Sequence, residues 1–241
     1  MSVIAIDATS QSSGSGTTIT WSHSTAGQNR YLIVGATAMT GSFVSSVTYN
    51  SVAMTRLVRA YSGSSYPNAE LWGLPNPTTG ANNIIVTFNN APTAGATVSG
   101  VSYNYVSQFS AIATSGSASG SSTAPLVFMT ANSIVGIIGE SGSATFTAGA
   151  SQTQRVNYTT GSGVAAIRNY TADRLNLTSG TQYISGSLSA VRGWAAVGIA
   201  LNASLPNDEV FKSLPRFTRI RKTPCIKKIS GLNLWPRAPS S

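Results

Sequence analysis

Residues 29–60 read NRYLIVGATAMTGSFVSSVTYNSVAMTRLVRA, and the fold prediction rests mainly on this segment. Tyr31 to Ala38 form a near-continuous apolar run, which is typical of a β-strand buried on both faces. Further along, Val47 and Tyr49 alternate with polar residues, and the same period of two resumes after Asn50-Ser51. Because Asn tolerates the positive φ of a tight turn, the two alternating segments predict a β-hairpin.

Short alternating or apolar segments recur along residues 1–204, separated by turns rich in Gly, Ser and Pro. About a dozen short strands at this spacing predict an all-β protein, an antiparallel β-sandwich of jelly-roll type. No helix signal of useful length appears before residue 205, and no charged or Pro-rich linker divides the segment. We therefore expect residues 1–204 to form one domain.

Two pairs of similar segments suggest an internal repeat. Apolar runs begin at Tyr31 and Ser133, and alternating strands begin at Ile84 and Tyr183, in both cases about one hundred residues apart. One interpretation is a duplicated unit of four or five strands. The other is that Ser- and Gly-rich β sequences resemble one another through composition alone, and the sequence leaves both open.

The charge of the chain is unevenly distributed. Residues 1–204 carry seven Arg, no Lys and four acidic residues, for a net +3, whereas residues 205–241 carry eight basic and two acidic residues, for a net +6. Charged residues make up only 9% of the chain, but 41% of residues are apolar, so the composition is not that of a disordered protein. The difference in charge indicates that two segments of different physical character are joined near Ser204.

Residues 205–241, here called the C-terminal arm, contain five prolines, whose spacing excludes a long helix and favours extended segments. Basic residues alternate with apolar ones, which predicts an arm that lies across a partner surface and buries its apolar side chains there. A protein partner is favoured over nucleic acid, which the basic residues could also bind. The expected anchoring residues are Phe211, Arg216, Phe217, Arg219, Arg221, Lys222, Lys227, Lys228 and Trp235.

The sequence offers little for catalysis. Its one histidine, His23, lies in WSHST without a nucleophile-elbow motif, and we expect it in a turn at the surface. Cys225 is the only cysteine, so neither a disulfide framework nor a conventional zinc site is available. Glu70 and Glu140 are expected at solvated strand ends or faces rather than as a facing acid pair. We therefore predict no enzymatic activity, no cofactor and no metal.

The aromatic residues divide into a buried and an exposed group. Trp21, Trp72 and Trp194 lie in apolar strand patterns, which predicts packing in the core. Tyr61 and Tyr66 flank a Gly- and Ser-rich loop and are the better candidates for contact with a ligand such as a sugar ring.

Four segments together resemble a known family: TTITWSHSTAGQNRYLIVGATA, VSSVTYNSVAMTRLVRA, AELWGLPNPTTGANNIIVTF and GWAAVGIALN. They are similar to a jelly-roll module that recurs in bacteriophage virion proteins and bacterial surface proteins. The family's hairpin usually reads YNGVxL, from which YNSVAM departs at the Gly, whereas the closing W-A-x-x-G-x-x-L pattern is matched by Trp194, Ala195, Gly198 and Leu201. The arm lies outside the resemblance.

The resemblance implies a non-enzymatic structural protein of a virion, such as a capsid decoration, fibre or tail-appendage protein. Its expected partners are other virion proteins and copies of itself, and we expect it to be made in the host cytoplasm, without a signal peptide or membrane association. Two alternatives remain open: a carbohydrate-binding or adhesin module for host attachment, and a jelly-roll coat protein whose basic arm contacts nucleic acid.

Overall fold

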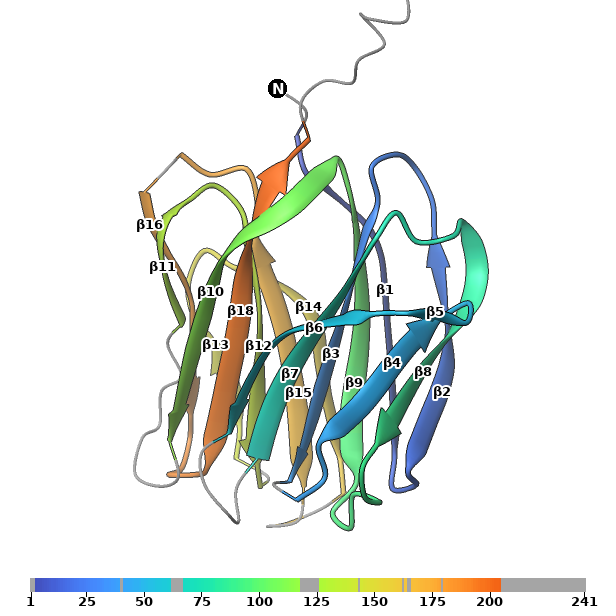
Figure 1. Ribbon diagram of the computed structural model, residues 1–241. Coiled ribbons are helices and arrows are strands. Elements are labelled where there is room, and N and C mark those ends of the chain that lie inside the picture. Colours follow the sequence, from blue (N-terminus) through green and yellow to red (C-terminus); the bar gives the residue numbers. More distant parts are fainter. Residues whose placement is uncertain are drawn as a thin grey trace, which may run out of the picture. The chain divides into compact units, whose positions relative to one another are not determined.

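The computed structural model describes residues 3–39, 41–61, 67–117, 126–142, 144–161, 163, 166–178 and 180–204. These residues belong to one compact unit, Met1–Pro206, and they form eighteen strands (Figure 1). All strand pairs are antiparallel and the sheets pack face to face, so the predicted antiparallel β-sandwich is confirmed.

The first half of the unit contains one inner and one outer sheet. The inner sheet has the order β1 (Ala5–Gly14), β9 (Ala96–Asn104), β3 (Tyr31–Met39), β7 (Pro67–Pro75) and β6 (Thr55–Tyr61). The outer sheet has the order β2 (Thr18–Thr25), β8 (Gly80–Phe88), β4 (Val44–Tyr49) and β5 (Val52–Ala53).

The second half repeats this plan. Its inner sheet has the order β10 (Val106–Ser117), β18 (Trp194–Ala203), β12 (Ile134–Ser141), β15 (Ile167–Arg174) and β14 (Thr153–Thr160). Its outer layer consists of two short pairs, β11 (Leu126–Ala131) with β16 (Gly180–Ile184) and β13 (Phe146–Ala148) with β17 (Gly186–Leu188).

The two inner sheets have the same strand order, so the fold is an internal duplication. β3 and β12, which contain the two apolar runs, occupy the third position of their sheets, and β8 and β16 each pair with the second strand of their half. The turns LPNPTTG and RLNLTSG match as well, because Asn76 and Asn176 both adopt a positive φ, 49° and 55°. The halves are joined through a single residue, Tyr105, between β9 and β10.

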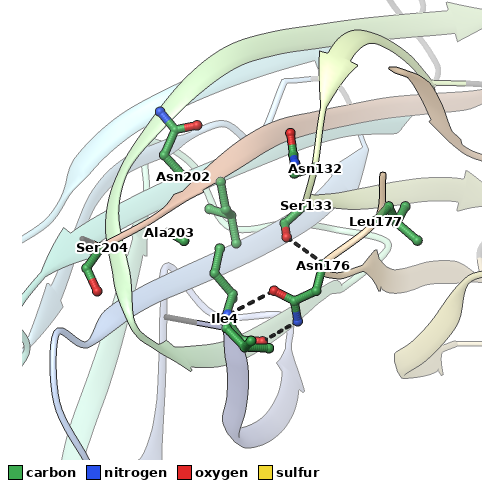
Figure 2. A pocket seen from close by; sticks show the side chains of 10 residues that line it. Ile4, Asn132, Ser133, Asn176, Leu177, Asn202, Ala203 and Ser204 are labelled. Atoms are coloured by element: carbon green, nitrogen blue, oxygen red, sulfur yellow. Dashed lines mark hydrogen bonds between the residues drawn. The ribbon is translucent and has the colours of Figure 1, made fainter. Parts of the chain in front are cut away.

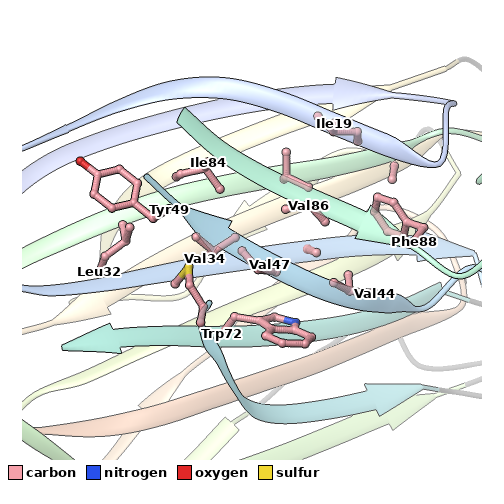
Figure 3. Packing of buried hydrophobic residues seen from close by; sticks show 14 of the residues in the cluster. Ile19, Leu32, Val34, Val44, Val47, Tyr49, Trp72, Ile84, Val86 and Phe88 are labelled. Atoms are coloured by element: carbon pink, nitrogen blue, oxygen red, sulfur yellow. The ribbon is translucent and has the colours of Figure 1, made fainter. Parts of the chain in front are cut away.

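Three layers of buried side chains separate the four sheet layers. Figure 3 shows the first, between β2, β4 and β8 on one side and β3, β7 and β9 on the other. β3 contributes to two layers, since Leu32 and Val34 enter the first and Tyr31 and Ile33 enter the second, between the inner sheets. This position explains why the run Tyr31–Ala38 is apolar throughout, and it confirms that the strand is buried on both faces.

The predicted hairpin is also present. β4 and β5 pair as Tyr49↔Val52, and the two residues between them, Asn50 and Ser51, have φ values of 47° and 64°. Positive φ at both positions is the geometry of a type I′ turn. β5 ends at Ala53, and the chain then crosses from the outer to the inner sheet, where β6 pairs with β7.

Candidate functional site

The structure corrects the expectation for Glu70. The side chain is completely buried, with Oε1 accepting a hydrogen bond from the backbone N–H of Val44 at 2.9 Å and Oε2 lying 3.0 Å from Nη2 of Arg59. Arg59 Nη2 also donates to the carbonyl of Val44 at 3.0 Å. Glu70 was expected at a solvated position, but its carboxylate instead fastens the start of β4 to the inner sheet.

Glu140 is likewise buried rather than solvated. Its Oε2 accepts a hydrogen bond from Nε of Arg168 at 2.9 Å, while the same guanidinium donates to Asn157 Oδ1 at 2.7 Å and to the carbonyl of Ala144 at 3.1 Å. Burial raises the pKa of Glu140, although Arg168 and then Arg192 act in the opposite direction. Glu140 and its partner Arg168 lie beside Ala144 in the second half, whereas Glu70 lies beside the start of β4 in the first half. The two carboxylates therefore do not form a facing acid pair.

A third buried carboxylate joins the two halves. Asp173 Oδ2 accepts hydrogen bonds from Tyr103 Oη of the first half, at 2.8 Å, and from Arg155 Nε of the second, at 2.7 Å. Burial raises the pKa of Tyr103 well above its usual value, and the charge of Asp173 adds to this effect. Ser99 and Thr171 form a further hydroxyl contact between the halves at 3.0 Å. The central layer between the inner sheets therefore contains polar contacts as well as packed apolar side chains.

His23 lies in β2 and not in a surface turn, with 2% of its surface exposed. Its Nδ1 is 2.7 Å from Ser10 Oγ and its Nε2 is 3.1 Å from Ser102 Oγ. Ser102 Oγ donates to Asp7 Oδ2 at 2.8 Å, and Trp21 Nε1 donates to Ser10 Oγ at 2.8 Å. Five polar side chains from β1, β2 and β9 therefore form one chain of hydrogen bonds.

The hydrogen positions in this series of hydrogen bonds follow from its two end groups, the Asp7 carboxylate and the Trp21 N–H. The Asp7 carboxylate only accepts, so the hydrogen of Ser102 is used there and Ser102 must accept the N–H of His23 Nε2. Nδ1 is then an acceptor, and Ser10 donates to it while accepting from Trp21. Burial lowers the pKa of this neutral imidazole to about 4, although the charge of Asp7 opposes the shift.

Gly100 makes the space for this arrangement. A Cβ at this position would lie 2.9 Å from Ser10 Oγ and 3.2 Å from His23 Nδ1. Every polar hydrogen in this series of hydrogen bonds already has an acceptor, so the series holds β1 against β2 and β9. The sequence carries no signal for it, because Asp7, His23 and Ser102 are far apart along the chain and meet only when β1 pairs with β9.

The predicted ligand-contact residue Tyr61 is at the surface, with 61% of its area exposed. Its ring packs edge-on against Phe43, with ring centroids 6.2 Å apart, and the guanidinium of Arg59 lies 4.6 Å from the centroid of Phe43. Sequence reasoning missed Phe43, which the loop between β3 and β4 brings beside the end of β6. Tyr66 and all nine predicted anchoring residues of the arm lie outside the described residues.

A concave pocket of about 410 Å³ lies where the start of β1 meets the end of β18 (Figure 2). Ile4 and Leu201 give it an apolar floor, and its other lining residues include Asn132, Asn176 and Ser204. Asn176 binds the backbone of Ile4 in both directions, accepting from its N–H at 2.9 Å and donating to its carbonyl at 2.7 Å. We call this site the terminal pocket.

Comparisons with known proteins add no relative: no family model, no curated protein and no solved structure matches the chain. Within the described ranges, no three His, Cys, Asp or Glu side chains gather in a group that could hold a metal ion. In the same part of the chain, no helix is long and apolar enough to cross a membrane.

Proposed function

We propose that this protein is a non-enzymatic structural subunit of a bacteriophage particle, in the role of a capsid decoration, fibre or tail-appendage protein. The β-sandwich is the exposed body, and the C-terminal arm fastens it to neighbouring subunits. The observation that carries the proposal is the division of charge: the last 37 residues carry a net +6 and all the lysines of the chain, interleaved with apolar residues. Such an arm gains most by burying its apolar side chains on another protein.

The strand pairing supports a jelly-roll body in each half. The first strand pairs with the last (β1 with β9, β10 with β18), the second with a strand near the end (β2 with β8, β11 with β16), and the third with the next one inward (β3 with β7, β12 with β15). This nested order is what a long antiparallel hairpin produces when it wraps into a jelly roll. The sequence resemblance to virion modules points in the same direction.

The internal hydrogen bonds support a mechanical role. Each of the buried carboxylates Glu70, Glu140 and Asp173 is held by an arginine, and each contact joins separate strands or loops. Breaking a buried ion pair leaves an uncompensated charge and is costly, so these contacts oppose local opening of the sheets. A body that resists opening suits a protein displayed on the outside of a particle.

Light scattering on the full chain and on a variant that ends at Pro206 tests the proposal. We expect the full chain to form oligomers and the shortened chain to be a monomer with an unchanged β-sheet circular dichroism spectrum. Equal masses for the two proteins, both monomeric, would contradict assembly through the arm.

Tyr61 supports a second candidate function, binding of a host-surface glycan. An exposed tyrosine beside Phe43 offers an aromatic surface on which a sugar ring can stack, and Arg59 lies next to it. Retention on a glycan array that is lost in Tyr61→Ala, but kept in the control Tyr183→Ala at another exposed tyrosine, would favour this function. Absence of any glycan signal with the unchanged protein would contradict it.

A further inference from the structure

The terminal pocket has the properties of a site for a neutral peptide segment. Its ten lining residues include none with a charged side chain, so it gives no compensation to a charged ligand. Five lining residues provide apolar surface, namely Val3, Ile4, Leu177, Leu201 and Ala203, and the side chains of the other five supply amide and hydroxyl groups. Apolar walls with a few polar groups, in a volume of several hundred Å³, are typical of a binding pocket.

Asn176 shows how the pocket recognises peptide backbone. Its side-chain amide makes paired hydrogen bonds to the N–H and C=O of Ile4, as a neighbouring strand would (Figure 2). Asn132 and Asn202 line the same pocket, and no hydrogen bond of their side chains is present among the described residues. Their amides are therefore available to bind a second peptide in the same way.

We propose that the terminal pocket binds residues 229–236 of the C-terminal arm of a second copy of this chain. This inference rests on the proposed function and names the site that receives the arm. The segment reads ISGLNLWP and is the longest stretch of the arm without a charged residue. It is bounded by Lys228 and Arg237, so it is the part of the arm that a neutral pocket can bury without desolvating a charge.

The location of the pocket suits an exchange between two copies. Ser204 is a lining residue, and the arm follows it directly in the sequence. The 24 residues from 205 to 228 can extend to about 80 Å, which is enough to reach a facing copy. Two copies whose terminal pockets face one another can then exchange arms and close a symmetric dimer, in which each protomer donates and receives the same segment.

Photo-crosslinking of the full chain tests this site directly. p-Benzoylphenylalanine is incorporated in place of Trp235 in isotopically heavy protein, which is mixed with light unsubstituted protein and irradiated. We expect heavy–light covalent dimers with adducts on residues 3–4, 176–177 or 201–204. Adducts elsewhere on the partner, or adducts within one chain, overturn the inference. A small neutral ligand as the true occupant would be revealed by its mass in native spectra and by the absence of these adducts.

A matched pair of variants tests the role of charge at the pocket. Asn132 is exposed and its side chain has no hydrogen-bond partner among the described residues, so substitution leaves the fold intact. We expect Asn132→Lys to weaken dimerisation about tenfold or more, through its repulsion of Lys228 and Arg237, and Asn132→Gln to have little effect. Equal dissociation constants for both variants and the unchanged chain overturn the inference.

The two proposals fail in different ways. If the full chain is a monomer at every concentration, assembly through the arm is wrong and the pocket assignment falls with it. If the full chain forms oligomers that depend on the arm, but the cross-links avoid the terminal pocket, only the pocket assignment is wrong.

Discussion

The neutral, buried His23 should make the protein sensitive to acid in a defined pH range. An unfolded histidine has a pKa of about 6.5, whereas burial lowers that of His23 to about 4. Between these values the unfolded chain binds one more proton than the folded chain, so stability falls as the pH is lowered. From pH 7.5 to 4.5 the loss amounts to about 2.5 kcal/mol, since each pKa unit corresponds to about 1.4 kcal/mol.

Replacement of His23 by Gln isolates this contribution. Glutamine can donate to Ser102 and accept from Ser10 without titrating, so we expect the difference in unfolding free energy between wild type and His23→Gln to shrink by about 2.5 kcal/mol as the pH falls from 7.5 to 4.5. Urea denaturation at a series of pH values measures that difference. The carboxylates titrate in both proteins, so their contribution to the pH dependence cancels when one unfolding free energy is subtracted from the other.

Nuclear magnetic resonance gives an independent measurement. His23 is the only histidine, so its imidazole protons are a single unambiguous set of signals. We expect them to titrate near pH 4 in the folded protein. A midpoint at or above 6, or parallel pH profiles for wild type and His23→Gln, would refute the reasoning from burial.

Three further predictions concern stability, each measured by chemical denaturation at neutral pH. Tyr103→Phe removes one of the two hydrogen bonds to Asp173 Oδ2 and should cost about 1–3 kcal/mol, because the buried carboxylate loses a donor. Glu140→Gln leaves Arg168 without its counter-ion and should cost about 3 kcal/mol. Ser51→Gly should stabilise the protein by about 1 kcal/mol, because glycine adopts the φ of 64° without strain.

Two of these predictions have a matched control variant, and the third has an outcome that would contradict it. Tyr158→Phe removes a long hydroxyl contact of 3.3 Å and should have a small effect compared with Tyr103→Phe. Ser46→Gly places a glycine inside β4, where it should destabilise rather than stabilise. A Glu140→Gln protein as stable as wild type would show that the ion pair with Arg168 contributes nothing, and destabilisation by Ser51→Gly would contradict the turn assignment.

The strands could be predicted well because their signals are local. The apolar run at Tyr31 and the alternation around Asn50-Ser51 each lie within a few consecutive residues, and the structure confirms both the buried strand and the hairpin. The repeat was visible as a spacing of about one hundred residues, but only the matching sheet orders separate true duplication from similar composition.

The polar interior could not be predicted, and Glu140 shows why. A glutamate at the end of an apolar strand gives the same pattern whether its strand lies at an edge or between two layers. Its burial depends on Arg168, 28 residues away, which reaches it only because β12 and β15 pair. His23 was misplaced for the same reason, since Ser102 lies 79 residues from it.

The all-β class, the main strands and the separate character of the basic arm could be predicted from the sequence, because periodicity and charge are properties of neighbouring residues. The folded structure was needed to show which charged groups are buried, which atoms donate and which accept in the hydrogen bonds around His23, and where the terminal pocket lies. These features depend on side chains from distant strands meeting at fixed distances, and the register that brings them together is set by the packing of whole sheets.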